Sequence, residues 1–172
     1  IDYSILEGAL RDDLDEKVPR AMAVLDPLKL KLTNWEALFG AGHAEPCTAP
    51  VHPHHPDMGE RQFKLTSEIW IEREDFQEVP EKGFRRLFPE NMARLKYGYV
   101  IKCTGCEKDA EGKVTAVLAE IVPDTKSGTP GSDSVKVKGV ITWVSASEGL
   151  PVEIRLYDRL FTEAQPDAGG RN

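Results

Sequence analysis

The chain has 172 residues, with 22 Lys+Arg against 29 Asp+Glu, which gives a net charge of −7. This length suits one domain with a sizeable core, and the balance of 40% hydrophobic to 30% charged residues is that of a folded rather than a disordered chain. No apolar run approaches the roughly 20 residues that a membrane-spanning helix needs, so we expect no membrane association. The negative charge excludes a uniformly basic nucleic-acid coat, and any nucleic-acid site must be a local patch.

The first 17 residues predict an amphipathic helix, because apolar residues recur at spacings of three and four from Ile1 to Leu14. Pro19 then ends the helical pattern. The sequence starts without Met or a charged-then-apolar leader, and no partner helix follows nearby. We therefore expect residues 1–18 to be the helical remnant of a preceding domain, packed on something outside this chain.

Beyond Pro19 the pattern changes to the two-residue period of strands. The expected strands cover residues 21–25, 28–32, 68–72, 93–103, 114–122, 140–144 and 151–161. Between them we expect a long irregular loop over residues 40–60, which contain four prolines, a helical turn and loop over 73–92, a hairpin loop at 109–112, and a loop over 123–134. The polar tail, residues 162–172, is expected to be flexible. Many short strands and almost no helix predict a mainly β fold that forms a closed or nearly closed β-barrel.

Positive charge gathers in one stretch, residues 82–102, which carries six basic residues against Glu90 alone, a local net charge of +5. Aromatic residues, including Phe84, Phe88 and Tyr97, are interleaved with them. Arginines beside aromatics suit single-stranded nucleic acid, whose bases stack and hydrogen-bond. The alternative is a solvated β-surface whose lysines protect an exposed edge.

The other reactive residues give weaker signals. His52, His54, His55 and Asp57 could bind a metal, but the alternating prolines are expected to splay the imidazoles, and no further ligand follows at a recognisable spacing. Three cysteines (Cys47, Cys103 and Cys106) are too few for a disulfide framework and favour a reducing cytoplasm. No catalytic motif or phosphate-binding loop is present, so we predict neither a catalytic nor a metal site.

Several stretches together resemble the anticodon-binding region of the glutaminyl-tRNA synthetase family. They are residues 19–24 with 26–30, 52–53 with 58–62, 68–71, 99–102, 136–145 and 150–161, the last with its Val-Glu-Ile-Arg-Leu-Tyr-Asp-Arg-Leu-Phe run. The resemblance covers nearly the whole chain and implies a barrel similar to ribosomal protein L25. It places the proximal anticodon-binding barrel at residues 19–161. The glutamyl enzymes of archaeal and eukaryotic type share this barrel and are the nearest alternative.

Matched to the family motif, Arg20 is implied to bind the middle anticodon base, a uracil in glutamine tRNA. Arg86 is implied to read the third base, a guanine, while Arg94 and Arg85 contact the variable first base. Guanidinium groups suit these roles because they pair with acceptor atoms on base edges. His54 occupies a position where the family has an Asn that contacts the loop. Near the third-base pocket the family often has Gln, Lys and Arg, whereas this chain has Gly83 followed by Arg85 and Arg86, which implies that one amide contact is missing.

The resemblance also implies a parent enzyme that is cytoplasmic and monomeric and attaches glutamine to its tRNA. Its ATP and Mg²⁺ belong to a catalytic domain that would precede Ile1, and we expect no cofactor in this chain. We expect the chain itself to recognise the tRNA anticodon loop. One alternative is a freestanding barrel of the L25 type that binds duplex ribosomal RNA, and another is a metal-dependent enzyme built on the histidine segment.

Overall fold

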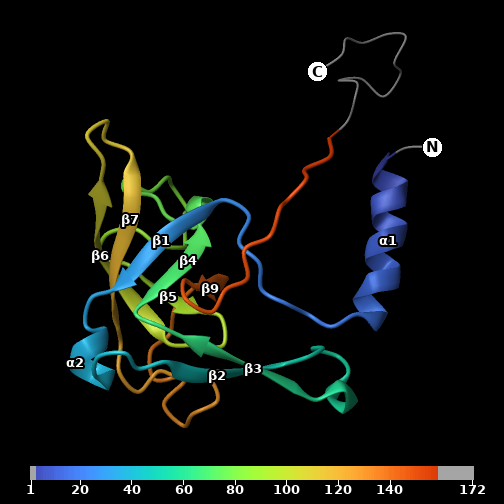
Figure 1. Cartoon of the computed structure of the whole chain (residues 1–172), viewed down its shortest axis with the longest axis horizontal. Coiled ribbons are helices and arrows are strands. Elements are labelled where there is room, and N and C mark those ends of the chain that lie inside the picture. Colours follow the sequence, from blue (N-terminus) through green and yellow to red (C-terminus); the bar gives the residue numbers. More distant parts are fainter. Residues whose placement is uncertain (1–2, 159–172) are drawn as a thin grey trace.

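A computed structural model describes residues 3–158 and contains one long helix and nine strands (Figure 1). The helices are α1 (Tyr3–Lys17), α2 (Trp35–Phe39) and the single 3₁₀ turns η1 (Pro56–Met58) and η2 (Arg73–Asp75). The strands are β1 (Pro27–Leu32), β2 (Glu45–Pro50), β3 (Glu60–Leu65), β4 (Glu68–Glu72), β5 (Met92–Leu95), β6 (Val100–Lys108), β7 (Val114–Ile121), β8 (Gly139–Ile141) and β9 (Trp143–Ser145). The predicted mainly β fold is therefore confirmed.

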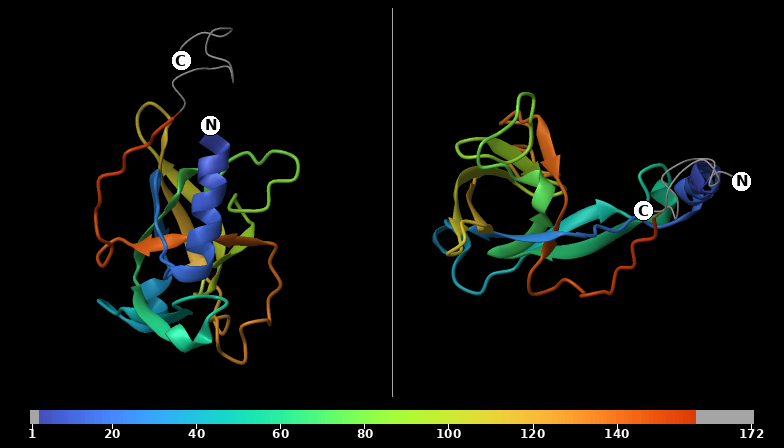
Figure 2. Two further views of the ribbon diagram at one scale, coloured as in Figure 1. Left: turned by 90° about the vertical axis from the view of Figure 1, so that its right-hand side faces the viewer. Right: turned by 90° about the horizontal axis from the view of Figure 1, so that it is seen from above.

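Seven strands form one curved sheet in the order β8-β5-β6-β7-β1-β4-β9 (Figure 2). Neighbouring strands are antiparallel except for the β1–β7 and β5–β8 pairs. The two edge strands, β8 and β9, follow each other in the chain with only Thr142 between them. The chain thus passes directly from one edge of the sheet to the other, and this crossing nearly closes the barrel. The likeness to ribosomal protein L25 stays a prediction.

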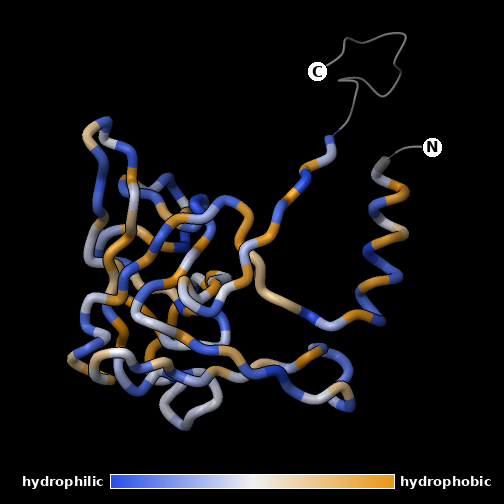
Figure 3. Tube along the Cα trace, viewed as in Figure 1, coloured by the Kyte–Doolittle hydropathy of each residue, from blue (hydrophilic) through white to orange (hydrophobic). Residues whose placement is uncertain are grey.

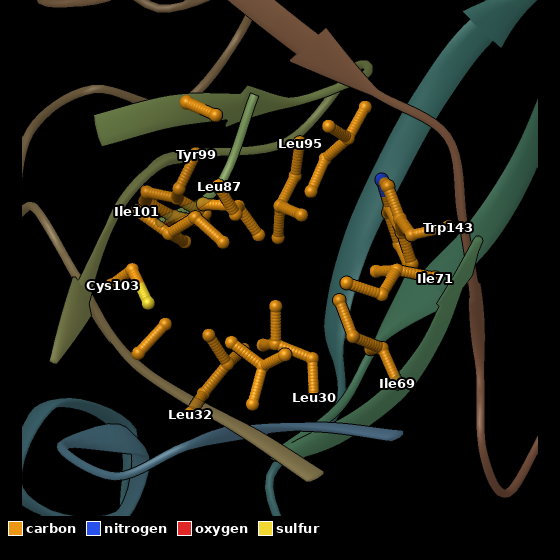
Figure 4. Packing of buried hydrophobic residues seen from close by; sticks show 14 of the residues in the cluster. Leu30, Leu32, Ile69, Ile71, Leu87, Leu95, Tyr99, Ile101, Cys103 and Trp143 are labelled. Carbon is orange, nitrogen blue, oxygen red and sulfur yellow. The ribbon is translucent and has the colours of Figure 1, made fainter. Parts of the chain in front are cut away.

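The barrel is filled by the apolar side of each strand, as β1 illustrates. Leu28, Leu30 and Leu32 are buried, while Lys29 and Lys31 between them are partly exposed, because successive side chains of a strand point to opposite faces. The labelled side chains in Figure 4, among them Trp143, point toward one another inside the barrel. The expected strands at 28–32, 68–72 and 114–122, and the hairpin loop at 109–112, are confirmed to within a residue or two.

The expectation of a long irregular loop over residues 40–60 is wrong, because β2 runs through its middle. β2 pairs with β3 from Glu45–Leu65 to Pro50–Glu60, in a two-stranded hairpin that projects from the barrel toward α1 (Figure 1). Pro46 and Pro50 lie within β2, which has β3 as its only strand partner in the described part of the chain. Proline is tolerated there because an edge strand has backbone positions that donate to no neighbour.

The expected single strand over residues 93–103 is also wrong, because the chain reverses in its middle. β5 ends at Leu95, and β6 begins at Val100 and runs back beside it. Tyr97 adopts a positive φ of 63° in the turn, and the Gly98 N–H donates to the Leu95 carbonyl at 2.7 Å. A residue other than glycine rarely adopts the left-handed backbone conformation, so the sequence gives little indication of a turn at Tyr97.

Two further expected strands are absent from the described residues. Residues 21–25 have no strand partner, and residues 151–158 form no strand, with Leu150 and Leu156 more than 80% exposed. Residues 21–25 are a short apolar run and residues 151–158 alternate as a strand does, but a strand also needs a neighbouring strand to pair with. Residues 159–161 and the predicted flexible tail, 162–172, lie outside the described residues.

The helix expected over residues 1–17 is confirmed as α1, which lies apart from the barrel (Figures 1 and 2). Its apolar residues alternate with polar ones along the turns (Figure 3). Ile5, Leu6 and Leu10 are 56–66% exposed, as expected for a helix whose apolar side chains do not pack on this barrel. Within residues 3–158, no helix combines the length and apolar character required to cross a membrane.

Candidate nucleic-acid interface

Arg85 and Arg86 lie in the connection between η2 and β5, where a short backbone ladder fixes their position. Phe76 forms an isolated parallel bridge with Leu87. The Leu87 N–H donates to the Asp75 carbonyl at 2.9 Å, and the Gln77 N–H donates to the Leu87 carbonyl at 3.0 Å. The Arg86 carbonyl in turn accepts a 2.6 Å hydrogen bond from the Asn91 side chain. The backbone at Arg86 is therefore held from both sides.

The Arg86 guanidinium is anchored through a single nitrogen. Its Nη1 donates to Glu74 Oε1 at 3.0 Å and lies 2.8 Å from Asp75 Oδ1. Within the described residues its Nε and Nη2 make no hydrogen bond, and the side chain is 43% exposed. The N–H groups of Nε and Nη2 point in the same direction from one side of the guanidinium, so they can pair with two acceptors at once. The Arg86 guanidinium is thus held at Nη1, while its Nε and Nη2 can still donate hydrogen bonds to a ligand.

The two carboxylates at Arg86 differ in burial. The Asp75 side chain is 7% exposed and that of Glu74 is 76% exposed. Burial raises the pKa of Asp75 to about 6, although the positive charge of Arg86 acts in the opposite direction. The pKa of Arg86 is raised, first by its hydrogen bond to Glu74 and further by the charge of Asp75. Arg86 therefore stays charged at any physiological pH.

Arg85 is exposed, and its guanidinium has no partner among the described residues. Its backbone, in contrast, touches the crossing segment that nearly closes the barrel. A Cβ atom added to Gly139 would lie 2.3 Å from the Arg85 carbonyl oxygen, so glycine is required there for the two backbones to approach. Arg85 and Arg86 thus sit beside the start of β8, on a rigid part of the wall.

Arg94 on β5 has a different environment, because its guanidinium is surrounded by the loop over residues 123–134. Nη1 donates to the Thr125 carbonyl at 2.8 Å and to the Gly98 carbonyl and Ser127 Oγ at 3.3 Å, and Nη2 donates to the Ser132 carbonyl. The structure gives this arginine a loop-holding role. Its predicted contact with the first anticodon base stays a prediction.

The same loop is also held through a carboxylate on β2. Glu45 Oε1 accepts hydrogen bonds from Lys126 Nζ at 2.6 Å and the Tyr99 hydroxyl at 3.1 Å, and Glu45 Oε2 lies 2.8 Å from His43 Nε2. Hydrogen bonds from these groups and the Lys126 charge lower the pKa of Glu45 although burial acts to raise it, while burial and the Glu45 charge raise the pKa of Tyr99. This network fastens the β2–β3 hairpin to the barrel.

Arg20 and His54 lie on the side of the molecule where the hairpin approaches α1. The Arg20 guanidinium donates to the Asp15 carbonyl and carboxylate at 2.7 and 2.5 Å and to the carbonyls of Leu14 and Val18 at 3.3 and 3.2 Å. It therefore binds the last turn of α1, where cations complement the helix dipole. His54 is exposed, and its backbone N–H donates to His52 Nδ1 at 3.1 Å. The predicted base contacts of Arg20 and His54 stay predictions.

The histidine segment is arranged differently from the expectation that its prolines splay the rings apart. The His52 ring lies 4.5 Å from the His55 ring and 5.8 Å from the His54 ring, centre to centre. Because His52 Nδ1 accepts from the His54 N–H, its Nε2 carries the proton that is donated to the Asp15 carbonyl at 2.7 Å. Both His52 nitrogens are thus occupied, and in residues 3–158 no three His, Cys, Asp or Glu side chains are placed to share a metal ion.

The five predicted site residues thus fall into two groups. Arg85, Arg86 and Arg94 lie on the barrel wall around β5, whereas Arg20 and His54 lie near the hairpin tip and the end of α1, which project away from the barrel (Figure 1). Arg85 and Arg86 lie together because they are adjacent in the chain. The guanidinium groups of Arg20 and Arg94 donate hydrogen bonds to backbone carbonyls of this chain.

Sequence reasoning missed a cleft of about 410 Å³ between β3 and β9, whose lining includes Met22, Arg61, Phe63 and Trp143. The Arg61 guanidinium lies over the Phe63 ring at 4.7 Å, and its Nε is buried without a hydrogen-bond partner in the described structure. The alternation of Arg61 and Phe63 could have signalled this pair, since residues two apart in a strand share a face.

Comparison with known proteins supplies a family. Residues 18–122 match a family model described as "tRNA synthetases class I (E and Q), anti-codon binding domain", and residues 140–172 match a second model of the same description. The chain is 65% identical to a glutamine–tRNA ligase of Ralstonia pickettii, 62% to that of Cupriavidus taiwanensis and 59% to that of Bordetella pertussis. Each match covers 100% of this chain and 29% of the relative.

Proposed function

Because the chain belongs to the family of anticodon-binding domains of the class I glutamyl- and glutaminyl-tRNA synthetases, we propose that it binds the anticodon loop of glutamine tRNA. In this proposal the connection between η2 and β5 supplies the base-reading contacts, with Arg86 on the third anticodon base and Arg85 beside it. The similarity to glutamine–tRNA ligases favours glutamine over glutamate as the amino acid of the parent.

The single observation that carries the proposal is the state of the Arg86 side chain. One nitrogen is anchored to two carboxylates, and the edge formed by Nε and Nη2 is unpaired within the described structure. A guanine presents two acceptors, O6 and N7, that match this edge, and such a pair contributes about 1–3 kcal/mol of discrimination against other bases. An unstacked loop base exposes these atoms in a way that a duplex does not.

The activity of the longer relatives is a separate part of the proposal. The chain spans less than a third of their length, and we assign glutamine attachment, with its ATP and Mg²⁺, to the part of a monomeric cytoplasmic enzyme that these 172 residues do not cover. All three cysteines are free, which is compatible with a reducing compartment.

A binding titration tests the proposal. We would measure the affinity of the chain for a glutamine anticodon stem-loop and for the same hairpin with its third base changed from guanine to adenine, each at two salt concentrations. The native chain should prefer guanine at both salts, because base contacts depend on salt less than phosphate contacts do. Arg86→Ala should remove about 5-fold or more of that preference.

Lys113→Ala is the matched control, since Lys113 is exposed in the β6–β7 turn and its side chain has no partner among the described residues. It should lower the affinity for both hairpins equally or not at all. An equal loss for both hairpins in Arg86→Ala would make Arg86 a phosphate contact and refute the assignment. A preference of the native chain for a duplex over the loop would favour the ribosomal-RNA-binding alternative.

A further inference from the structure

We propose that Asp75 is a positioning residue for base recognition, which holds the Arg86 guanidinium by Nη1 so that its Nε and Nη2 edge is presented to the RNA. The inference rests on the proposed function and adds a specificity residue to it. Asp75 itself touches no RNA in this proposal, because its side chain is 7% exposed.

The backbone fixes the distance between the two residues. Asp75 is the last residue of η2, and its carbonyl accepts the hydrogen bond from the N–H of Leu87, which follows Arg86. The next residue, Phe76, is bridged to Leu87. Asp75 and Arg86 therefore belong to the two sides of one short ladder, and the 2.8 Å between Oδ1 and Nη1 joins two anchored side chains.

Glu74 also contacts Arg86 Nη1 and accepts its hydrogen bond at 3.0 Å, but its side chain is 76% exposed and its charge is screened by water. Asp75 Oδ1 forms an ion pair with the same nitrogen at 2.8 Å, and because protein surrounds this carboxylate, water screens the attraction less. The backbone of Asp75 is also held by its hydrogen bond from Leu87, so we assign the positioning of the guanidinium to the buried carboxylate.

A purely structural ion pair is the competing explanation, and the cost of ionising Asp75 argues against it. Burial raises the pKa of this carboxyl to about 6 against the opposing effect of Arg86, so the folded chain holds the ionised carboxylate less readily than the unfolded chain does. The facing charged groups are Arg86, Glu74 and Glu72. The Asp75–Arg86 ion pair therefore does not favour folding, yet it holds an exposed guanidinium in place. This combination fits a role in positioning Arg86 for base recognition.

Asp75→Asn tests the proposal, because it keeps the size and one acceptor oxygen, while it removes the charge and replaces the other oxygen by an NH₂ group. In the anticodon-hairpin titration it should reduce the preference for guanine by about 3- to 10-fold, because Arg86 loses its ion pair with a buried, weakly screened carboxylate. Glu74→Gln should reduce it by less than 2-fold. The matched control is Glu78→Gln, which removes a charge from the same segment, paired with Lys108 and not with Arg86, and should leave the preference unchanged.

The same substitution in an Arg86→Ala background separates positioning from a general structural effect. If Asp75 acts through Arg86, Asp75→Asn changes the guanine preference in the native background and has no further effect in Arg86→Ala. An equal effect in both backgrounds, or none in either, overturns the inference. Loss of preference in Arg86→Ala but not in Asp75→Asn overturns this inference alone, whereas an unchanged preference in Arg86→Ala overturns the proposed function itself.

A folding check accompanies each variant, since loss of the carboxylate could disturb the ladder. Asp75→Asn should fold, because an amide avoids the cost of burying a charge. Should it not fold, Asp75→Glu carries the test, because it keeps the charge and displaces it by one methylene. A reduced guanine preference in that variant supports the inference, and an unchanged preference overturns it.

Discussion

Replacing Arg94 by Met should destabilise the barrel, because this guanidinium is the main tie between β5 and the loop over residues 123–134. Within residues 3–158, Arg94 is the one side chain that donates a hydrogen bond to the Thr125 carbonyl, at 2.8 Å, and Thr125 is fully buried. An orphaned buried carbonyl costs about 1–3 kcal/mol, and loss of the other hydrogen bonds, to Gly98, Ser127 and Ser132, adds about 1 kcal/mol. We therefore expect a loss of about 2–4 kcal/mol.

For a chain of this size each kcal/mol lowers the melting temperature by about 2–4 °C, so thermal unfolding followed by circular dichroism should show a decrease of about 5–15 °C. Arg85→Met is the control, since it removes the same group from an exposed position without a partner in the described structure, and it should change the stability by at most about 0.5 kcal/mol. If Arg94→Met melts with the native chain yet binds the anticodon hairpin more weakly, Arg94 is an RNA contact and not a loop tie.

Three other expectations follow from the geometry. Gly139→Ala should lower the free energy of unfolding by about 1–3 kcal/mol in a urea titration, because the new Cβ would lie 2.3 Å from the Arg85 carbonyl oxygen. The control is Gly8→Ala in α1, where the Cβ has open space and the change should be neutral or stabilising. Equal effects of the two substitutions would contradict the close approach at Gly139. Because burial raises the pKa of Asp75 to about 6, the folded state binds this proton more tightly than the unfolded state does. The contribution of Asp75 to the free energy of unfolding should therefore fall by at most about 3 kcal/mol as the pH rises from about 4 to about 6. Urea titrations at several pH values should show this loss in the native chain and not in Asp75→Asn. Arg20→Met should speed hydrogen exchange in α1 and leave β6 and β7 unchanged, and unaltered exchange in α1 would disprove the tie.

The parts of the fold that could be predicted are those in which local pattern and tertiary pairing agree. β1 alternates Leu and Lys because one face is core and the other is not, and that alternation is visible in the sequence. The chain reverses at Tyr97, which has a positive φ, and a tyrosine in the sequence gives no indication of such a turn. Residues 151–158 show the opposite failure, because their alternation is strand-like but no described strand pairs with them.

The sequence could indicate the stretch that carries the candidate site but not the state of its side chains. The clustering of basic residues points to residues 82–102, which include the accessible Arg85 and Arg86, yet the arginines look equivalent in the sequence. Arg94 differs because carbonyls more than 30 residues away in the chain surround it. Whether a guanidinium is free or already bonded depends on the tertiary structure, and only the structure separates the arginines that can read a base from those that hold the protein.

The same reasoning applies to the acidic neighbours of Arg86. Glu74 and Asp75 are adjacent and both bind Nη1, but the ladder between Phe76 and Leu87 buries one carboxylate and leaves the other in water. The exposed carboxylate accepts a hydrogen bond from Nη1, but water screens its charge. The charge of the buried carboxylate is screened less and is fixed in place, and the same burial opposes its ionisation. A recognition module that reads one base with one arginine needs that orientation, so the unfavourable burial of Asp75 follows from the specificity that we assign to Arg86.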